Sequence, residues 1–273
     1  MTEPERAALD HIRRVVDSVI GESSPEETVS PQEIASMAVP ERVSFNCLPV
    51  PYLSQMMGEG TVNDSGAVVG AMLVQAYTGK SLTPAEFLNQ NGQFNETALT
   101  LAQVSNVLRM NGVPVETRSG LKLSDLVLIL FSGRPAIVLV RQIVLQQGGL
   151  TTESFDGPHH LVCVGMDLRY VYTHDPLRRD ASGQAQPIPW LTFHRAWTQA
   201  SGAERAALVP RMQLIRRIKI TAATLNVRQE PNDETSLAGT VTAGDVYEVS
   251  AQRDGWGKIG ENRWINLSYV NEI

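Results

Sequence analysis

The chain has 273 residues, of which 42% are hydrophobic and 19% charged, so it can form one large or two smaller folded domains, and wholesale disorder is excluded. The formal net charge of −6 disfavours binding to nucleic acid or to an anionic membrane surface. No apolar run is long enough to span a bilayer. Cys47 and Cys163 are the only cysteines, too few for a disulfide scaffold or a zinc site, and we expect no metal and no cofactor.

Residues 1–42 are predicted to form a helical extension. A weakly apolar helical face runs over residues 7–19 and ends at Gly21, and a second short helix is predicted over residues 31–37. The first 23 residues carry charge throughout and lack the continuous apolar stretch of a secretory signal. We therefore expect a cytoplasmic protein as synthesised. A cell-wall or extracellular location would require another export route or release by lysis.

Residues 43–217 are predicted to form one domain with helices first and strands after them. Apolar spacing and capping residues predict helices over residues 65–77, 83–90, 101–108, 126–131 (capped by Ser124 and Asp125) and 190–197. Continuous or alternating apolar runs predict strands over residues 135–145, 159–166 and 170–174. This order favours an α+β fold over alternating βαβ units.

From residue 221 to residue 273 the pattern changes to short β-like runs separated by turns. Tyr247, Val249 and Ala251 alternate with polar residues, which is the period of a half-buried strand, and no helical period is present. The sequence predicts a small all-β barrel here, with the boundary near residues 217–222.

Ser65 is the first candidate for chemistry. An Asn-Asp-Ser-Gly turn at residues 63–66 leads directly into a buried helix, whose N-terminal N–H groups and dipole favour negative charge. A nucleophile is often placed at such a position because the field lowers the pKa of a thiol. The alternative is structural: Asn63, Asp64 or Ser65 simply caps the helix.

A second candidate group lies at residues 159–175. His159 and His160 begin a buried strand, where their side chains point to opposite faces, and Asp175 ends the next strand. One histidine could act at the start of the strand while Asp175 orients it through its other ring nitrogen. The alternative is a surface histidine followed by a turn-forming Asp-Pro pair.

Together these segments resemble the papain-like cysteine peptidases, and more closely their bacteriocin-processing relatives, family thirty-nine of the cysteine peptidases. The chain reads Val-Pro-Tyr-Leu-Ser-Gln at residues 50–55, Asn-Asp-Ser-Gly at 63–66, a histidine-containing strand ending in Gly-Met-Asp at 165–167, and His-Asp-Pro at 174–176. The resemblance covers about residues 43–215. It implies a two-lobed α+β fold with a helical half, a β half and a cleft between them.

Carried over by position, the resemblance assigns a role to each candidate. Ser65 stands where the family has its nucleophilic cysteine, and His159 matches the general base because it precedes Gly165 by six residues. His160 is the rival if the strand is shifted by one residue. Asp175 matches the orienting acid, and Gln55 is the candidate for the oxyanion-hole amide.

The departures from the family pattern bear on activity. Ser65 replaces the cysteine, and Ala67 stands where a proline is usual. A serine hydroxyl stays protonated under pKa shifts of ~3–5 units, so it cannot form the family's thiolate–imidazolium pair. The first hypothesis is therefore a peptide-binding pseudoenzyme. The alternatives are an active thiol peptidase or cell-wall peptide amidase whose cysteine was mutated, and a non-enzymatic assembly partner. Ser65→Cys is expected to give a thiol that reacts near neutral pH.

The C-terminal segment carries a second resemblance, to the bacterial SH3-type domain. It rests on Leu-Asn-Val-Arg at 225–228, Gly-Trp-Gly-Lys-Ile at 255–259 and the closing run at 263–270. The resemblance implies binding to cell-wall peptides or to a neighbouring domain, with Trp256, Trp264 and Tyr269 as the aromatic candidates. The alternative is that both tryptophans belong to the barrel core. Four basic against eight acidic residues in 221–273 give −4, which disfavours a purely electrostatic grip on an anionic polymer. The sequence does not indicate an oligomeric state.

Overall fold

The computed structural model describes residues 10, 13–18, 21, 47–56, 64–92, 98–153, 155–167, 169–212, 214, 216–253 and 255–272. Of the N-terminal extension, residues 13–18 are helical, and Val15 and Val16 are buried in the main hydrophobic core. The helix predicted over residues 31–37 lies outside the described residues.

A six-stranded antiparallel sheet organises the larger part of the chain, in the order β1-β6-β2-β3-β4-β5. Its strands are β1 (Val115–Arg118), β2 (Ala136–Arg141), β3 (Pro158–Met166), β4 (Tyr170–His174), β5 (Gln186–Pro189) and β6 (Ala207–Pro210). The fold is therefore mixed α and β, and the pairing is antiparallel throughout this sheet, as expected for α+β rather than βαβ units.

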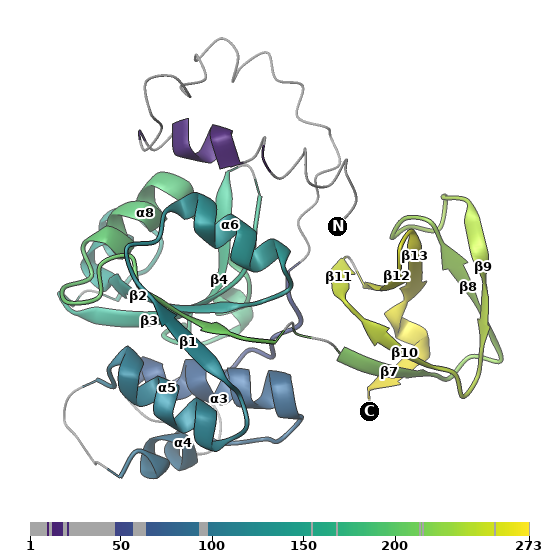
Figure 1. Ribbon diagram of the computed structural model, residues 1–273, viewed down its shortest axis with the longest axis horizontal. Coiled ribbons are helices and arrows are strands. Elements are labelled where there is room, and N and C mark those ends of the chain that lie inside the picture. The colour runs from purple at the N-terminus through teal and green to yellow at the C-terminus, as the bar shows by residue number, and fades with distance from the viewer. Residues whose placement is uncertain are drawn as a thin grey trace.

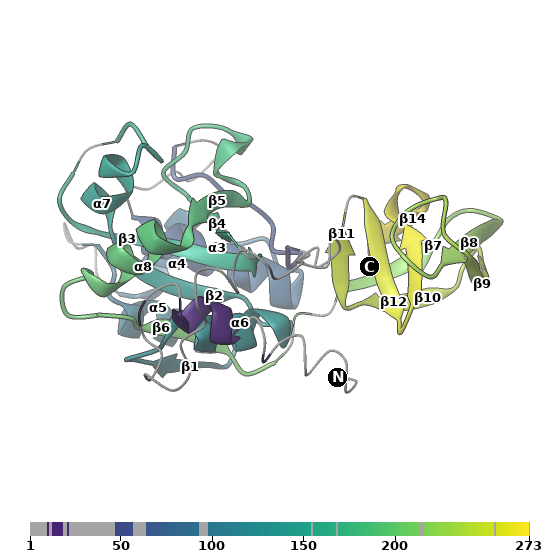
Figure 2. The ribbon, with the colours of Figure 1, turned by 90° about the horizontal axis from the view of Figure 1, so that it is seen from above.

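Helices lie on both sides of this sheet. They are α3 (Ser65–Thr78), α4 (Pro84–Gln90), α5 (Leu101–Met110), α6 (Leu123–Phe131), α7 (Gln142–Gln147) and α8 (Trp190–Thr198). Figure 1 shows α3, α4 and α5 gathered on one side, with α6 and α8 on the other, and Figure 2 shows the same elements from above. Helix α3 is buried over its first ten residues because it is small and apolar nearly all round. It therefore packs inside the domain, with its N-terminus near the start of β3.

Local capping signals account for several helix ends. Thr83 and Thr100 each form a capping box, with Glu86 and Gln103 respectively, and Gly79 ends α3 in the left-handed conformation. The predicted cap of α6 is wrong by two residues. This helix begins at Leu123 after Lys122, and Asp125 acts from its third position by accepting the Lys122 backbone N–H.

The strand predicted over residues 135–145 is also wrong in its second half. Strand β2 ends at Arg141, and Gln142–Gln147 form α7. A continuous apolar run does not separate a buried strand from a buried helix, and only the glutamines in this stretch favour the helix.

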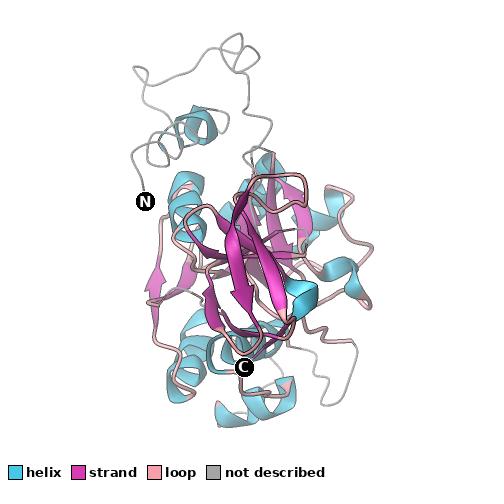
Figure 3. Ribbon diagram, turned by 90° about the vertical axis from the view of Figure 1, so that its right-hand side faces the viewer, coloured by secondary structure: helices cyan, strands magenta, loops and turns pink. Residues whose placement is uncertain are grey.

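Strands β7 to β14 form a separate C-terminal lobe, seen on the right of Figure 1 and facing the viewer in Figure 3. They are β7 (Arg216–Ile220), β8 (Thr224–Arg228), β9 (Leu237–Thr242), β10 (Val246–Val249), β11 (Ala251–Arg253), β12 (Trp256–Gly260), β13 (Arg263–Asn266) and β14 (Val270–Glu272). Pairing among these described strands gives two sheets, β10-β7-β14 and β11-β12-β13-β8-β9, rather than the single closed barrel expected. The lobe has a hydrophobic cluster of its own, built around Ile218, Val227 and Ile265.

Candidate active site

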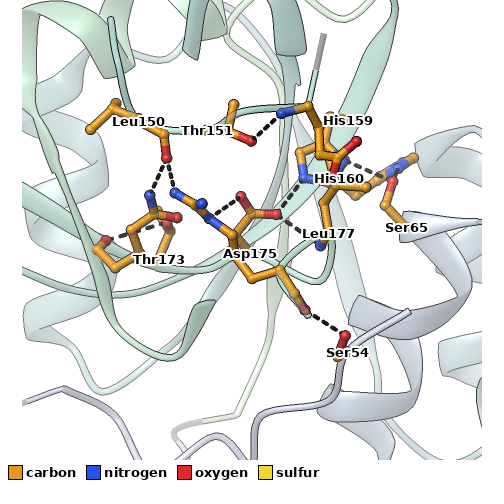
Figure 4. Close-up of polar contacts among 12 residues, drawn as sticks. Ser54, Ser65, Leu150, Thr151, His159, His160, Thr173, Asp175 and Leu177 are labelled. Carbon is orange, nitrogen blue, oxygen red and sulfur yellow. Dashed lines mark hydrogen bonds and ion pairs between the residues drawn. The ribbon is translucent and has the colours of Figure 1, made fainter. Parts of the chain in front are cut away.

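Helix α3 places Ser65 at its first turn, but another residue caps the helix. Asp64 Oδ1 accepts the backbone N–H of Ala67 at 3.0 Å, and Asp64 Oδ2 accepts that of Leu99 at 2.9 Å. The capping alternative therefore applies to Asp64 and not to Ser65. The hydroxyl of Ser65, buried at the start of α3, is left to contact β3 (Figure 4).

Ser65 hydrogen-bonds to His160 twice. Its Oγ accepts the backbone N–H of His160 at 3.0 Å and lies 3.1 Å from His160 Nδ1. Because Oγ already accepts the backbone N–H, its own proton can be donated to Nδ1, which places the ring proton on Nε2. The alternative tautomer donates Nδ1–H to the same oxygen. Both arrangements keep the imidazole neutral.

The surroundings of His160 favour this neutral form. The ring is fully buried, and burial, followed by the charge of neighbouring His159, lowers its pKa to about 3. Its Nε2 has no hydrogen-bond partner among the described residues. An unpartnered buried polar atom costs about 1–3 kcal/mol. Space at the ring is also tight, because a Cβ on Gly66 would lie 3.1 Å from His160 Cε1.

Asp175 pairs with the other histidine. His159 Nε2–H donates to Asp175 Oδ1 at 2.7 Å, both side chains are 2% exposed, and the backbone N–H of Leu177 donates to the same carboxylate oxygen at 3.0 Å. Burial raises the pKa of Asp175, but the charge and hydrogen bond of His159, the Leu177 amide and Arg178 outweigh it, so the pKa is lowered overall. This carboxylate is therefore ionised at neutral pH.

The expected arrangement had one imidazole, His159, between Ser65 and Asp175. Half of it is found: His159 contacts Asp175. The other half is wrong, because the hydrogen bonds of Ser65 in the described structure go to His160. The physical reason is the strand itself. Adjacent residues of β3 point to opposite faces, so a nucleophile position and an acid that lie on opposite sides contact different histidines.

Residues 52–55 are fastened to the loop that follows Asp175. Tyr52 Oη donates to the carbonyls of Asp175 and Arg178, Ser54 Oγ donates to that of Arg178, and the backbone N–H of Gln55 donates to Pro176 at 2.8 Å. The side chain of Gln55 is buried. The structure thus places Gln55 beside the Asp175 loop, and its role as an oxyanion-hole donor stays a prediction.

The profile of the Peptidase_C39 like family matches residues 47–204, which is more than half of the chain. The chain belongs to this family. No curated protein sequence matches it.

Eleven chains of solved structures resemble the C39-like chain. A C39-like peptidase from Bacillus anthracis has 18% identity and a TM-score of 0.45, and the match covers 62% of this chain and 98% of that one. A double glycine motif protease from an AMS/PCAT transporter, solved in complex with the leader peptide, has 18% identity and a TM-score of 0.40 over 61% and 95%. Ly7917 has 11% identity and a TM-score of 0.30 over 82% and 94%. These likenesses are too distant to assign a role to any residue.

The sequence did not predict the contacts of two side chains in the C39-like domain, His174 and Phe155. His174 Nε2–H donates to the carbonyl of Val50 at 2.8 Å, and its Nδ1 accepts the backbone N–H of Ala185 at 3.0 Å. Burial lowers the pKa of His174, so it acts as a neutral clamp. Phe155 packs edge-on against His159, with ring centroids 6.3 Å apart, although its own side chain is 41% exposed. In the sequence, the position of His174 next to Asp175 was the one feature that could have indicated its role.

Neither cysteine of the C39-like chain is a substitute nucleophile. Cys163 lies in the buried interior of β3, and burial raises the pKa of its thiol. Burial and the charge of Asp167 raise the pKa of Cys47 to about 11. Both thiols are therefore protonated at neutral pH.

The three aromatic candidates of the C-terminal lobe separate into two groups. Trp256 and Trp264 lie in the paired strands β12 and β13 and are buried, which contradicts their expected exposure. Tyr269 is 50% exposed. No helix in the described part of the chain is long and apolar enough to cross a membrane.

Proposed function

We propose that this C39-like protein is a pseudoenzyme, which binds peptides and hydrolyses them poorly or not at all. The observation that carries the proposal is the division of the site: the Ser65 hydroxyl is held by His160, while Asp175 is held by His159. The family's activity needs a nucleophile, a base and an orienting acid in one chain of contacts, and these contacts do not connect here.

The chemistry of the Ser65–His160 pair supports this reading. A serine nucleophile needs a base that takes its proton during attack, held by a third group on the far ring nitrogen. His160 is a weak base because its pKa is about 3, and its far nitrogen, Nε2, meets no carboxylate. The imidazolium that would form on attack has no stabilising partner in the described structure.

The proposed binding of peptides is supported by contacts of the site that do not involve Ser65. Tyr52, Ser54 and the Gln55 backbone fix one segment against the Asp175 loop, and the ionised Asp175 holds His159. These contacts hold residues 52–55, the Asp175 loop and the start of β3 in fixed relative positions without a nucleophile, and we assign the peptide site to the surface beside them. Peptide is the substrate class implied by the family.

The test compares cleavage and binding in one mixed peptide library. The native chain is expected to retain a subset of peptides without cleaving them. His159→Ala and Asp175→Asn, which remove the retained pair, are expected to weaken that retention. Cleavage by the Ser65 protein at a rate typical of cysteine peptidases would refute the pseudoenzyme. Absence of any peptide retention would favour the assembly-partner alternative, and a cysteine codon at position 65 of the encoding gene would favour the active thiol peptidase or cell-wall amidase.

We further propose that residues 221–273, together with strand β7, form an SH3-type module that binds cell-wall peptide. In support, the lobe has its own hydrophobic cluster, and Tyr269 exposes an aromatic side chain beside β14. Retention of the chain on purified peptidoglycan is expected to fall several-fold with Tyr269→Ala. The exposed Leu237→Ala is the matched control because it removes a similar apolar area elsewhere on the lobe. Equal retention of both variants would refute this role for Tyr269.

A further inference from the structure

The ring of His160 does not have the contacts of a catalytic histidine. It is hydrogen-bonded to Ser65, whereas Asp175 is hydrogen-bonded to His159. We infer that His160 is a positioning residue that holds the side chain at position 65 away from the His159–Asp175 pair, so that the serine is only one of two causes of inactivity. This inference deepens the proposed pseudoenzyme. It changes the expectation for Ser65→Cys, because a thiol at position 65 would meet His160 rather than His159.

The first support is geometric. In the described structure both hydrogen bonds of Ser65 go to His160, whose Nδ1 lies at the Ser65 hydroxyl and whose Cε1 leaves little room for a Cβ on Gly66. His159 leaves β3 toward the opposite face and is fixed by Asp175. A side chain at position 65 that turns toward His160 therefore turns away from His159.

The second support is electrostatic. A thiolate–imidazolium pair at position 65 needs a protonated ring beside the thiol, and a fully buried imidazole with no carboxylate on Nε2 does not become protonated near neutral pH. Among the described residues, His159, next to this ring in β3, helps to lower its pKa, and the Asp64 carboxylate, which lies close to Gly66, opposes a thiolate at position 65. His160 thus lies where a thiolate at position 65 would need a positively charged partner, but its imidazole stays neutral.

The third support is that one contact does not depend on the ring. The backbone N–H of His160 donates to Oγ at 3.0 Å and would remain in any non-proline variant. Replacing the ring with leucine keeps this donor and an apolar side chain of similar size. It removes only the imidazole, so the variant separates the two effects.

The experiment measures, against pH, the rate at which iodoacetamide alkylates the thiol introduced at position 65, with the modified site identified by mass spectrometry. The variants are Ser65→Cys, Ser65→Cys/His160→Leu, and the latter with His159→Gln. Cys47 and Cys163, whose thiols stay protonated, serve as internal controls.

We expect the single variant to titrate at or above the ordinary thiol pKa of ~8.5. The double variant is expected to titrate at least about one pKa unit lower, a tenfold gain in thiolate at pH 7. The triple variant is expected to lose that gain.

A low thiol pKa in Ser65→Cys that rises when His160 is replaced would overturn the inference, since His160 would then be the working partner. An unchanged pKa in the double variant would overturn it as well. These readouts need no peptide, so they are independent of the binding and cleavage that test the proposed function.

A measurement on the native chain covers the case in which the leucine variant does not fold. Histidine ring-nitrogen NMR is expected to show His160 neutral down to pH 5. Asp175→Asn, which removes the partner of His159, is expected to leave the titration of His160 unchanged. Titration of His160 near pH 6.5, or a response of His160 to Asp175→Asn, would overturn the inference.

Discussion

Tyr52 Oη donates a hydrogen bond to the backbone carbonyl of Asp175, 123 residues away in sequence, at 3.0 Å. The same hydroxyl donates to the carbonyl of Arg178 at 3.2 Å. The opening segment of the C39-like domain is thereby tied to the residue that orients His159. In the described structure, the Val-Pro-Tyr motif thus supports the site through the backbone of the Asp175 loop and not through a hydrogen bond to His159 or His160.

Gly183 makes this contact sterically possible. A Cβ at this position would overlap both Tyr52 Oη and the carbonyl oxygen of Asp175. Gly183→Ala is therefore expected to lower the free energy of unfolding by more than 2 kcal/mol, within the ~1–3 kcal/mol range of overpacking. Tyr52→Phe, which loses only the hydroxyl, is expected to cost about 1 kcal/mol. Urea denaturation measures both.

Gly260→Ala is the matched control for Gly183→Ala. A Cβ at Gly260 would approach only the flexible side chain of Arg263, at 3.3 Å, so a small effect is expected. Equal losses for the two alanine variants would contradict the steric role of Gly183.

The stability of the C39-like domain is expected to fall below pH 6.5. His160 and His174 are held neutral in the folded state, because their pKa values are lowered, but both become protonated in the unfolded chain near pH 6.5. The unfolded state therefore binds more protons as the pH falls, which stabilises it. Each histidine contributes a loss of about 1.4 kcal/mol per pH unit from about pH 6.5 down to its folded pKa, which is about 3 for His160.

Denaturation curves at pH 8, 6, 5 and 4 measure this slope. His160→Leu is expected to reduce the slope by about one proton, which is about 1.4 kcal/mol per pH unit. Asp175 adds a further loss below its ordinary pKa of 3.8, because its folded pKa is lowered and protonation then breaks its pair with His159. A flat profile between pH 7 and pH 5 would contradict the neutral histidines.

Local chemistry explains which parts of this fold could be predicted from the sequence. The capping box at Thr83 and the stop at Gly79 depend on contacts within a few residues, and both were predicted correctly. The strands β1, β5 and β6 were not predicted, because each is only four residues long and is defined by partners far away in the chain.

The same distinction holds in the site. The pairing of His159 with Asp175 was predicted correctly because the spacing of two adjacent strands fixes it. The contact of Ser65 with His160 was not, since it depends on how α3 approaches one face of β3, which residue spacing does not encode. The apolar run after Pro135 failed for a related reason, because burial alone does not distinguish β2 from α7.

Phe155 is expected to shield His159 from solvent. Its ring packs edge-on against the imidazole and is partly exposed, whereas His159 is 1% exposed. Phe155→Ala is expected to increase the rate of His159 modification by diethyl pyrocarbonate several-fold. His174, clamped between Val50 and Ala185, is the internal control and is expected to stay unreactive. Unchanged modification of His159 would show that other groups cover it.

The chain passes from the C39-like domain to the C-terminal lobe between Leu214 and Ile218. Leu214 packs in the core of the C39-like domain, and Ile218 packs in the cluster of the C-terminal lobe. Strand β7 (Arg216–Ile220) pairs with β10 and β14, so it belongs to the C-terminal sheet.

A chain ending at residue 215 is expected to be folded and monodisperse by size-exclusion chromatography. A chain ending at residue 220 would carry β7 with Ile218 and Ile220 unpaired and exposed, and it is expected to aggregate more readily. Replacing both isoleucines with serine in the longer chain is the control, and it is expected to restore solubility. Unfolding of the shorter chain would show instead that the C-terminal lobe is an integral part of the domain.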